Sequence, residues 1–241
     1  MSVKKSAVLG ILGGLGPLSS AYFYEMITLH TKAMRDQDHI DIMLSSRATI
    51  PDRTDYILSR SNSDPSPIMV EELKKLITAG ADYIAIPCNT AHYFYDILKV
   101  ESSVPILNMV SDTIDHCISK GARKVGILAT EGTVKAGIYR SVCEERGIEC
   151  YEPGEAGQTA VTRIIYDQIK TGIIANADDV LLVEKELKDA GCDFAILGCT
   201  ELSVAKKQLC LGPWFLDALE VLAKKAIEVC GKEPIGFTDL D

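Results

Sequence analysis

The chain has 241 residues, of which 47% are hydrophobic and 24% are charged, and its formal net charge is −9. This length and apolar fraction suit one large domain or two small lobes with a sizeable core, and they exclude a mainly disordered chain. An excess of acidic residues repels phosphate backbones, so nucleic acid is not an expected partner. The sequence contains no apolar run of about 18 residues, so it predicts no membrane span.

Short apolar runs alternate along the chain with longer amphipathic segments. The runs predict strands buried on both faces, as in a parallel sheet, at 7–12, 40–44, 83–87, 125–129 and 194–197. The intervening segments predict helices at 19–33, 68–79, 90–100, 111–120, 134–146, 159–171 and 177–190. Such alternation predicts an α/β fold of three layers, with helices on both sides of a mainly parallel sheet.

An internal repeat indicates that the chain contains two lobes of this kind. Residues 79–88 (AGADYIAIPC) align without a gap with residues 190–199 (AGCDFAILGC), so that Cys88 falls on Cys199. We therefore expect two similar three-layer α/β lobes related by pseudo-two-fold symmetry, with the active site in the cleft between them. We expect residues 1–108 plus 212–241 to form the first lobe and residues 109–211 to form the second.

Cys88 and Cys199 each follow a predicted strand and precede a predicted helix start. Ligands of open α/β sheets bind beyond the carboxyl ends of the strands. The free N–H groups and the dipole of a helix start bind anions and lower the pKa of a nearby thiol from about 8.5. If the lobes face each other, the two sulfurs flank one bound carboxylate, so that one removes a proton from its α-carbon and the other returns a proton to the opposite face.

Other uses of these residues stay open at this point. Cys88, His92 and Cys199 could ligate a metal ion, and the two cysteines could carry redox chemistry, although the chain has no CxxC pair. The glycine-rich run at 13–17 fits neither phosphate-binding motif, and it provides either a close backbone approach to a ligand or a tight turn. Because no secretion signal accompanies the eight cysteines, we expect reduced thiols and a cytoplasmic protein.

The chain resembles the aspartate/glutamate racemase superfamily in blocks that run nearly from end to end and in the same order. Residues 87–92 (PCNTAH) and 198–202 (GCTEL) resemble its two cysteine signatures. Further blocks that resemble its aspartate racemase branch are 13–17 (GGLGP), 50–54 (IPDRT) and 165–170 (IYDQIK). The resemblance implies a homodimer that interconverts L- and D-aspartate, with glutamate as a second candidate, and that uses no cofactor and no metal. It implies a two-base proton transfer with Cys88 and Cys199 as the catalytic residues.

The resemblance also implies which residues bind an acidic amino acid. Those expected at its distal carboxylate are Asp52, Arg53, Thr54 and Lys170. Those expected at its α-carboxylate, through side chains and helix-start N–H groups, are Asn89, Thr90, Ala91 and Thr200. This assignment is chemically reasonable, because a planar Arg can hold a carboxylate through two parallel hydrogen bonds and Lys adds a point charge.

Departures from the family pattern bear on the substrate and the direction of reaction. Glu201 stands where the glutamate racemase branch has histidine, which favours the aspartate branch. Ser45, Ser46 and Arg47 replace an Asn-Asn-Pro-Gln type of sequence, so we expect Arg47 to add a cation near the cleft and leave the substrate range open. One-directional members have threonine at the first cysteine, so Cys88 implies reversible racemisation. The alternatives are maleate isomerisation, hydantoin racemisation, or a non-catalytic protein that binds acidic amino acids.

Overall fold

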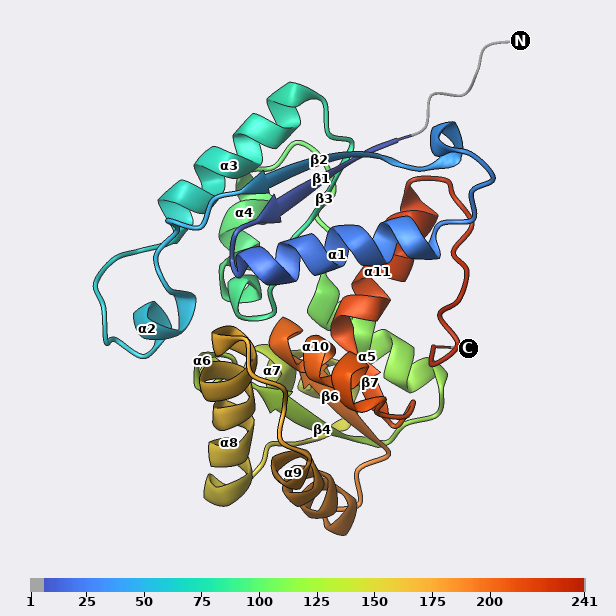
Figure 1. Cartoon of the computed structure of the whole chain (residues 1–241). Coiled ribbons are helices and arrows are strands. Elements are labelled where there is room, and N and C mark those ends of the chain that lie inside the picture. Colours follow the sequence, from blue (N-terminus) through green and yellow to red (C-terminus); the bar gives the residue numbers. More distant parts are fainter. Residues whose placement is uncertain (1–6, 241) are drawn as a thin grey trace.

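A computed structural model, which describes residues 7–240, contains two parallel β-sheets with helices on both sides of each (Figure 1). The first sheet has the strand order β2-β1-β3, and the second has the order β5-β4-β6-β7. The strands are β1 Val8–Gly13, β2 Asp41–Ser46, β3 Tyr83–Ala85, β4 Lys124–Ala129, β5 Glu149–Tyr151, β6 Phe194–Gly198 and β7 Phe215–Asp217. The predicted α/β fold with two parallel-sheet lobes is therefore confirmed.

Several of the helices that cover the sheets begin at a capping side chain or end at a left-handed glycine. In the first half of the chain the helices are α1 Pro17–His30, α2 Arg53–Ile57, α3 Ser66–Ala79, α4 Tyr95–Glu101 and α5 Met109–Ser119. In the second half they are α6 Glu131–Lys135, α7 Ile138–Arg146, α8 Glu155–Thr162, α9 Ala177–Asp189, α10 Thr200–Leu209 and α11 Ala218–Val229. The side chains of Asn108 and Asn176 accept backbone hydrogen bonds at the starts of α5 and α9, and a left-handed Gly80 ends α3.

The two sheets repeat one strand order, as the internal repeat predicts. β1, β2 and β3 correspond to β4, β5 and β6, and the aligned segments 79–88 and 190–199 contain β3 and β6. β7 is an addition to the second sheet, where Phe215–Asp217 pairs with β6. We expected the chain to return to the first lobe at residue 212, but it first adds this strand, because Phe215 and Leu216 are buried against the second sheet and its helices. α11 follows and contacts both β3 and β6.

One hydrophobic core is shared by the two lobes. Helices α1, α5 and α11 lie between the upper and lower sheets of Figure 1. A single cluster of buried side chains includes Leu9 of the first sheet, Ile127 and Ile196 of the second, and Leu222 of α11. Separate clusters pack on the outer face of each sheet. The lobes are therefore joined along one side by packed helices.

Several elements differ from the sequence prediction. β2 is an edge strand with partly exposed side chains, so it is not buried on both faces. The helix predicted at 90–100 begins as a 3₁₀ helix, η2 (Thr90–Phe94), and the one at 134–146 is divided at Gly137, whose φ is 64°. The segment predicted at 159–171 changes after α8 into a π-helix, η3 (Arg163–Gln168), and a 3₁₀ turn, η4 (Ile169–Thr171). π-Helices are rare and are frequent at functional sites.

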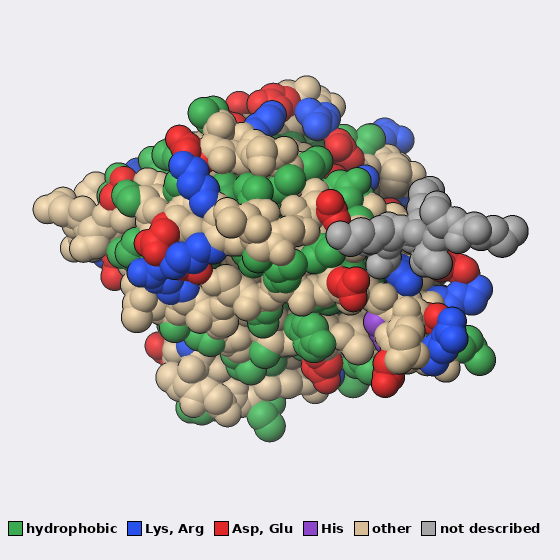
Figure 2. Space-filling view, turned by 90° about the horizontal axis from the view of Figure 1, so that it is seen from above, with side chains coloured by type: hydrophobic (Ala, Val, Ile, Leu, Met, Phe, Trp, Pro, Cys, Tyr) green, Lys and Arg blue, Asp and Glu red, His purple; other side chains and the backbone are tan. Residues whose placement is uncertain are grey.

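The surface over the first sheet carries mixed charge. In Figure 2 acidic and basic side chains lie next to one another on this face. On α3, for example, Lys75 pairs with Glu71 and Glu72, and Lys74 pairs with Glu101 of α4. Across residues 7–240, no helix combines the length and apolar character that crossing a membrane requires.

Candidate functional site

A small pocket between the lobes contains both predicted catalytic cysteines. Every predicted site residue except Ala91 lines it, together with Leu15, Thr130, Tyr166 and Glu201. Its free volume is about 20 Å³, which is little more than the 10–15 Å³ or so that a single water needs. The expected cleft is present, and it is nearly closed.

The two thiols have unequal surroundings. Cys199 directly follows β6, and its Sγ lies 2.9 Å from Oε2 of Glu201, to which it donates. Burial raises the pKa of Cys199 well above its ordinary value, and the Glu201 carboxylate raises it further. Burial also raises the pKa of Cys88, but the Arg53 cation and the backbone N–H of Ala91 oppose that shift. The thiolate is therefore better supported at Cys88 than at Cys199.

His92 links the Cys88 segment to the start of α5 through its two ring nitrogens. Its Nδ1 lies 2.9 Å from the carbonyl oxygen of Cys88, and its Nε2 accepts the backbone N–H of Met109 at 3.1 Å. Burial lowers the pKa of His92, which suits a neutral ring that donates from Nδ1. Both ring nitrogens are thus engaged, which leaves none for a metal ion. Among the described residues, no cluster of His, Cys, Asp and Glu side chains could hold a metal.

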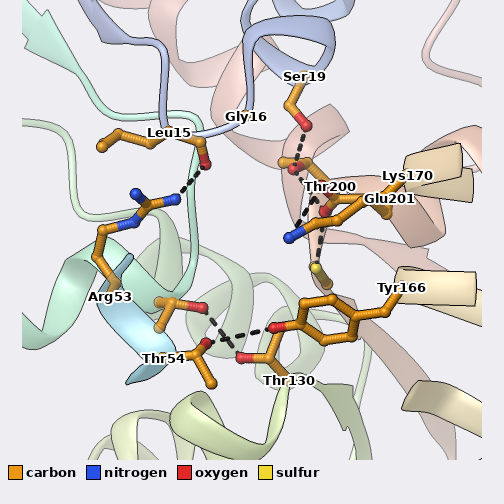
Figure 3. Close-up of polar contacts among 12 residues, drawn as sticks. Leu15, Gly16, Ser19, Arg53, Thr54, Thr130, Tyr166, Lys170, Thr200 and Glu201 are labelled. Carbon is orange, nitrogen blue, oxygen red and sulfur yellow. Dashed lines mark hydrogen bonds and ion pairs between the residues drawn. The ribbon is translucent and has the colours of Figure 1, made fainter. Parts of the chain in front are cut away.

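Arg53 and Lys170 approach the pocket from opposite sides (Figure 3). Arg53 is the first residue of α2, whose start Asp52 caps, and its guanidinium donates to the carbonyls of Leu15 at 3.1 Å and Pro51 at 3.0 Å. The ammonium of Lys170 lies 4.0 Å from Oε1 of Glu201 and 4.3 Å from the centre of the Tyr166 ring. Burial by itself would lower the pKa of Lys170, but Glu201 and its other neighbours raise it, so Lys170 stays cationic.

Two hydrogen-bond donors at this pocket are buried without a partner. They are Nε of Arg53 and Nδ2 of Asn89, whose Oδ1 accepts the Tyr139 hydroxyl at 2.6 Å. A buried donor without a partner is costly and rare, so each calls for an explanation. Two such donors beside two cations suit a ligand that brings anionic oxygens.

The two threonines predicted at the α-carboxylate bond instead across the lobes. The hydroxyl of Thr200 donates to Oγ of Ser19 at 2.7 Å. The hydroxyl of Thr90 lies 2.9 Å from that of Thr133 and 3.1 Å from that of Thr130. The N–H of Ala91 contacts Cys88, and its side chain lies outside the pocket. Contact of these residues with an α-carboxylate stays a prediction.

Arg47 does not supply the expected cation near the cleft. Its guanidinium lies 2.6 Å from Glu72 and 3.1 Å from Glu71, both on α3, and it lines neither the pocket nor the cavity outside it. Its backbone packs against Gly14, where an added Cβ would come within 2.4 Å of it. Gly14 has a φ of 83°, so the glycine-rich run provides both a tight turn and a close approach between β1 and β2.

Sequence reasoning left four residues at the site without a role: Glu201, Tyr166, Thr130 and Ser19. In the sequence, Glu201 only favours the aspartate racemase branch over the glutamate racemase branch, and Tyr166 is only part of the block at 165–170. A signal for Thr130 was available, because it directly follows β4, one of the two inner strands of its sheet. Ser19 meets Thr200 only through the packing of the two lobes, which no local pattern encodes.

A larger cavity opens outside the pocket and leads away from it. Its volume is about 440 Å³, and it shares Asp52, Arg53, Lys170 and Glu201 with the inner pocket. Apolar side chains form much of the rest of its wall, including Leu18, Ile50, Ile169 and Val204. A ligand in the inner pocket could therefore extend a side chain into the cavity past these four charged residues.

Comparison with known proteins gives one consistent result. The sequence model described as Asp/Glu/Hydantoin racemase matches residues 12–226. The chain is 28% identical to a broad-specificity amino-acid racemase of Bacillus subtilis (strain 168), over 91% of this chain and 96% of that protein. Its structure is similar to that of an aspartate racemase of Picrophilus torridus, with a TM-score of 0.78, 28% identity and coverage of 97% and 98% of the two chains. It is also similar to an aspartate racemase homologue of Pyrococcus horikoshii, with a TM-score of 0.75, 27% identity and coverage of 94% and 99%.

Proposed function

The chain belongs to the Asp/Glu/hydantoin racemase family, whose named amino-acid racemases are isomerases, and we propose that it interconverts L- and D-aspartate. In this proposal Cys88 and Cys199 exchange protons with the α-carbon, and no cofactor takes part. One observation carries the proposal. Two thiols, one from each lobe, share a nearly closed pocket with the cations Arg53 and Lys170, and Nε of Arg53 and Nδ2 of Asn89 are buried there without a partner.

The proposed reaction is a two-base proton transfer. The thiolate of one cysteine removes Hα, so that the Cα–H bond breaks, an S–H bond forms, and the electron pair spreads into the α-carboxylate. The thiol of the other cysteine then gives its proton to the opposite face of Cα, which forms a new C–H bond and leaves a thiolate. The added charge on the carboxylate is stabilised by nearby donors, for which Asn89 Nδ2 and the start of α10 are the candidates.

The side chain of aspartate would end between Arg53 and Lys170. Their positive charges suit a distal carboxylate, and the two similar structures are those of an aspartate racemase and an aspartate racemase homologue. A wider range is the second candidate, because the cavity of about 440 Å³ beyond these residues exceeds the needs of a single carboxylate. The name of the Bacillus subtilis relative supports this alternative.

Incubation of L-aspartate with EDTA-treated protein in D₂O tests the proposal. We expect D-aspartate in chiral chromatography, with deuterium at Cα, and the same end point from D-aspartate. Glutamate, alanine and lysine run in parallel would separate an acidic from a broad specificity. An absence of product isomer from every amino acid at saturating concentration would refute the racemase proposal. A succinyl adduct formed with maleate would favour maleate isomerisation instead, and saturable aspartate binding without deuterium uptake would favour a binding protein.

The oligomeric state and the cellular compartment also belong to the proposal. We propose a homodimer, which sedimentation equilibrium would test. The eight cysteines are all free thiols, which suits a reducing compartment such as the cytoplasm.

A further inference from the structure

We propose that Tyr139 is a positioning residue that holds the Asn89 amide with its donor end toward the α-carboxylate of the substrate. Tyr139 lies on α7 of the second lobe, is 1% exposed, and donates its hydroxyl hydrogen to Oδ1 of Asn89 at 2.6 Å. Asn89 belongs to the first lobe, is 2% exposed and directly follows Cys88. The inference rests on the proposed function and deepens it.

The two ends of an Asn side chain have opposite hydrogen-bonding roles. Oδ1 only accepts and Nδ2 only donates, so a hydroxyl that donates to Oδ1 leaves Nδ2 as the group offered to a ligand. With Oδ1 bound to Tyr139, Nδ2 is left buried and unpartnered at the pocket, where a carboxylate needs a donor. In the flipped orientation Oδ1 would face that carboxylate and repel it. The hydrogen bond that the Tyr139 hydroxyl donates therefore holds Asn89 in the orientation that can bind an anion.

The Tyr139 ring also contacts the second cysteine segment. A Cβ added at Gly198 would come within 3.0 Å of Cε2 of Tyr139, so the ring packs directly on the residue before Cys199. Gly198 aligns with Pro87 in the internal repeat, and the absence of a side chain at 198 gives the ring its space. One side chain thus touches both segments that carry the catalytic thiols, and it can fix their relative position.

The variant Tyr139→Phe removes the hydroxyl and keeps the ring. We expect it to fold with an unchanged circular dichroism spectrum, to raise KM for L-aspartate, and to lower kcat/KM tenfold or more. The variant Tyr151→Phe is the matched control, because it removes a tyrosine hydroxyl that donates to Glu186 outside the pocket. We expect its kcat/KM to stay within twofold of the wild type.

A double-mutant cycle separates positioning from general stability. If Tyr139 acts through Asn89, adding Tyr139→Phe to Asn89→Ala should cost no further activity. The inference is overturned if Tyr139→Phe matches the wild type, or if it costs as much in the Asn89→Ala background as it does alone.

Two further readouts distinguish failure of this inference from failure of the proposed function. If the wild type binds aspartate without racemising it, the proposed function fails, and calorimetry should still show tenfold weaker binding by Tyr139→Phe. If it does neither, the ¹⁵N side-chain amide signal of Asn89, identified with Asn89→Asp, should shift or broaden in Tyr139→Phe but not in Tyr151→Phe. An unchanged Kd or an unchanged amide signal in these cases overturns the inference.

Discussion

Single residues around the two sulfurs make the pocket asymmetric, although the lobes repeat one strand order. Cys199 donates to a carboxylate, whereas Cys88 faces a guanidinium and a backbone N–H. Because a thiolate is stabilised by positive charge and by donors, Cys88 forms its thiolate more readily than Cys199 does in the molecule without substrate. The proposed reaction at Cys199 requires its proton to leave against the field of Glu201.

Replacement of either cysteine by serine should separate the two faces of the substrate. In Cys88→Ser and in Cys199→Ser we expect racemisation to fall by orders of magnitude, because a serine hydroxyl is a much weaker acid and base than a thiol. Each variant should still exchange Cα–H for deuterium in one enantiomer, and the two variants should prefer opposite enantiomers. NMR in D₂O with each pure isomer measures this exchange.

The exposed Cys210, outside the pocket, provides the matched control, and Cys210→Ser should keep wild-type kinetics. Exchange of the same enantiomer by both site variants would contradict the placement of the sulfurs on opposite faces. A wild-type rate in either variant would exclude that cysteine from catalysis.

Removal of either cation should weaken the binding of an acidic side chain. A hydrogen bond to a charged group is worth about 1.5–3 kcal/mol, so Arg53→Ala and Lys170→Ala should lower kcat/KM for aspartate roughly ten- to hundredfold. Arg53→Ala should also reduce the preference for aspartate over alanine. Arg35→Ala is the control, because Arg35 forms an exposed ion pair with Asp38 within the first lobe and outside the pocket. Equal losses for aspartate and alanine would show that Arg53 does not contact the side chain.

Elements of the first lobe are tied together by a carboxylate at the end of the edge strand. Glu72 of α3 is bound by Ser45 at 2.5 Å, Arg47 at 2.6 Å and Lys75 at 2.9 Å. Burial alone would raise the pKa of Glu72, but these hydrogen bonds together lower it to about 2, from an ordinary value of 4.5. The charged form is therefore favoured in the folded state, and it links β2 to α3.

This linkage predicts a dependence of stability on pH. The folded state binds the Glu72 proton less readily than the unfolded chain does, so the stabilisation is complete above about pH 4.5 and is lost as the pH falls towards about 2. At pH 7 we expect Glu72→Gln to lower the free energy of unfolding by about 1.5–3 kcal/mol, with the difference from the wild type shrinking between those two pH values. Urea unfolding at pH 7, 4 and 3 measures it. The neighbouring, half-exposed Glu71 is the control, and Glu71→Gln should change stability by less than about 0.5 kcal/mol.

Elements that are very short, and side chains whose partners are distant in the sequence, are the features that could not be predicted from the sequence. The five predicted strands correspond to β1, β2, β3, β4 and β6, and at β3, which has three residues, the predicted run continues to residue 87. β5 and β7 have three residues each, too few to show a period, and were not predicted. The structure brings both thiols, Arg53 and Lys170, which the motifs singled out, into one pocket, and their roles stay predictions. Arg47 was misplaced because its partners lie on α3, a helix that the local sequence around residue 47 does not specify.

At the scale of the whole molecule, the pocket is closed by polar contacts between the lobes. The contacts and their distances are Asn89–Tyr139 2.6 Å, Ser19–Thr200 2.7 Å, Arg60–Glu131 2.8 Å, Thr90–Thr133 2.9 Å and Thr54–Tyr166 3.5 Å. A net worth of about 0.5–1.5 kcal/mol for each such bond makes the closed form stable but reversible. An amino acid needs more room than about 20 Å³, so we expect the pocket to widen at each entry and release and some of these contacts to break.

We therefore expect substrate entry and product release, and not the proton transfers, to limit kcat. Lobe motions of this kind take microseconds to milliseconds and are slowed by solvent friction. We expect kcat for aspartate to fall in proportion to the relative viscosity of sucrose solutions. Cα-deuterated aspartate is the control, since a slower chemical step should weaken the viscosity effect. A kcat that ignores viscosity but shows a full deuterium isotope effect would mean that chemistry is limiting.

The core shared by α1, α5 and α11 has a consequence for the fate of the transferred hydrogen. Because it binds the lobes together along one side, only the polar rim can part, and bulk water stays outside while the pocket is shut. In the proposed reaction the proton removed from one face of Cα then stays on the sulfur that accepted it until the product leaves. After product release the first cysteine would be the thiol and the second the thiolate, which is the protonation state that the reverse reaction requires. The free protein would keep this state until proton exchange with solvent restores the original one.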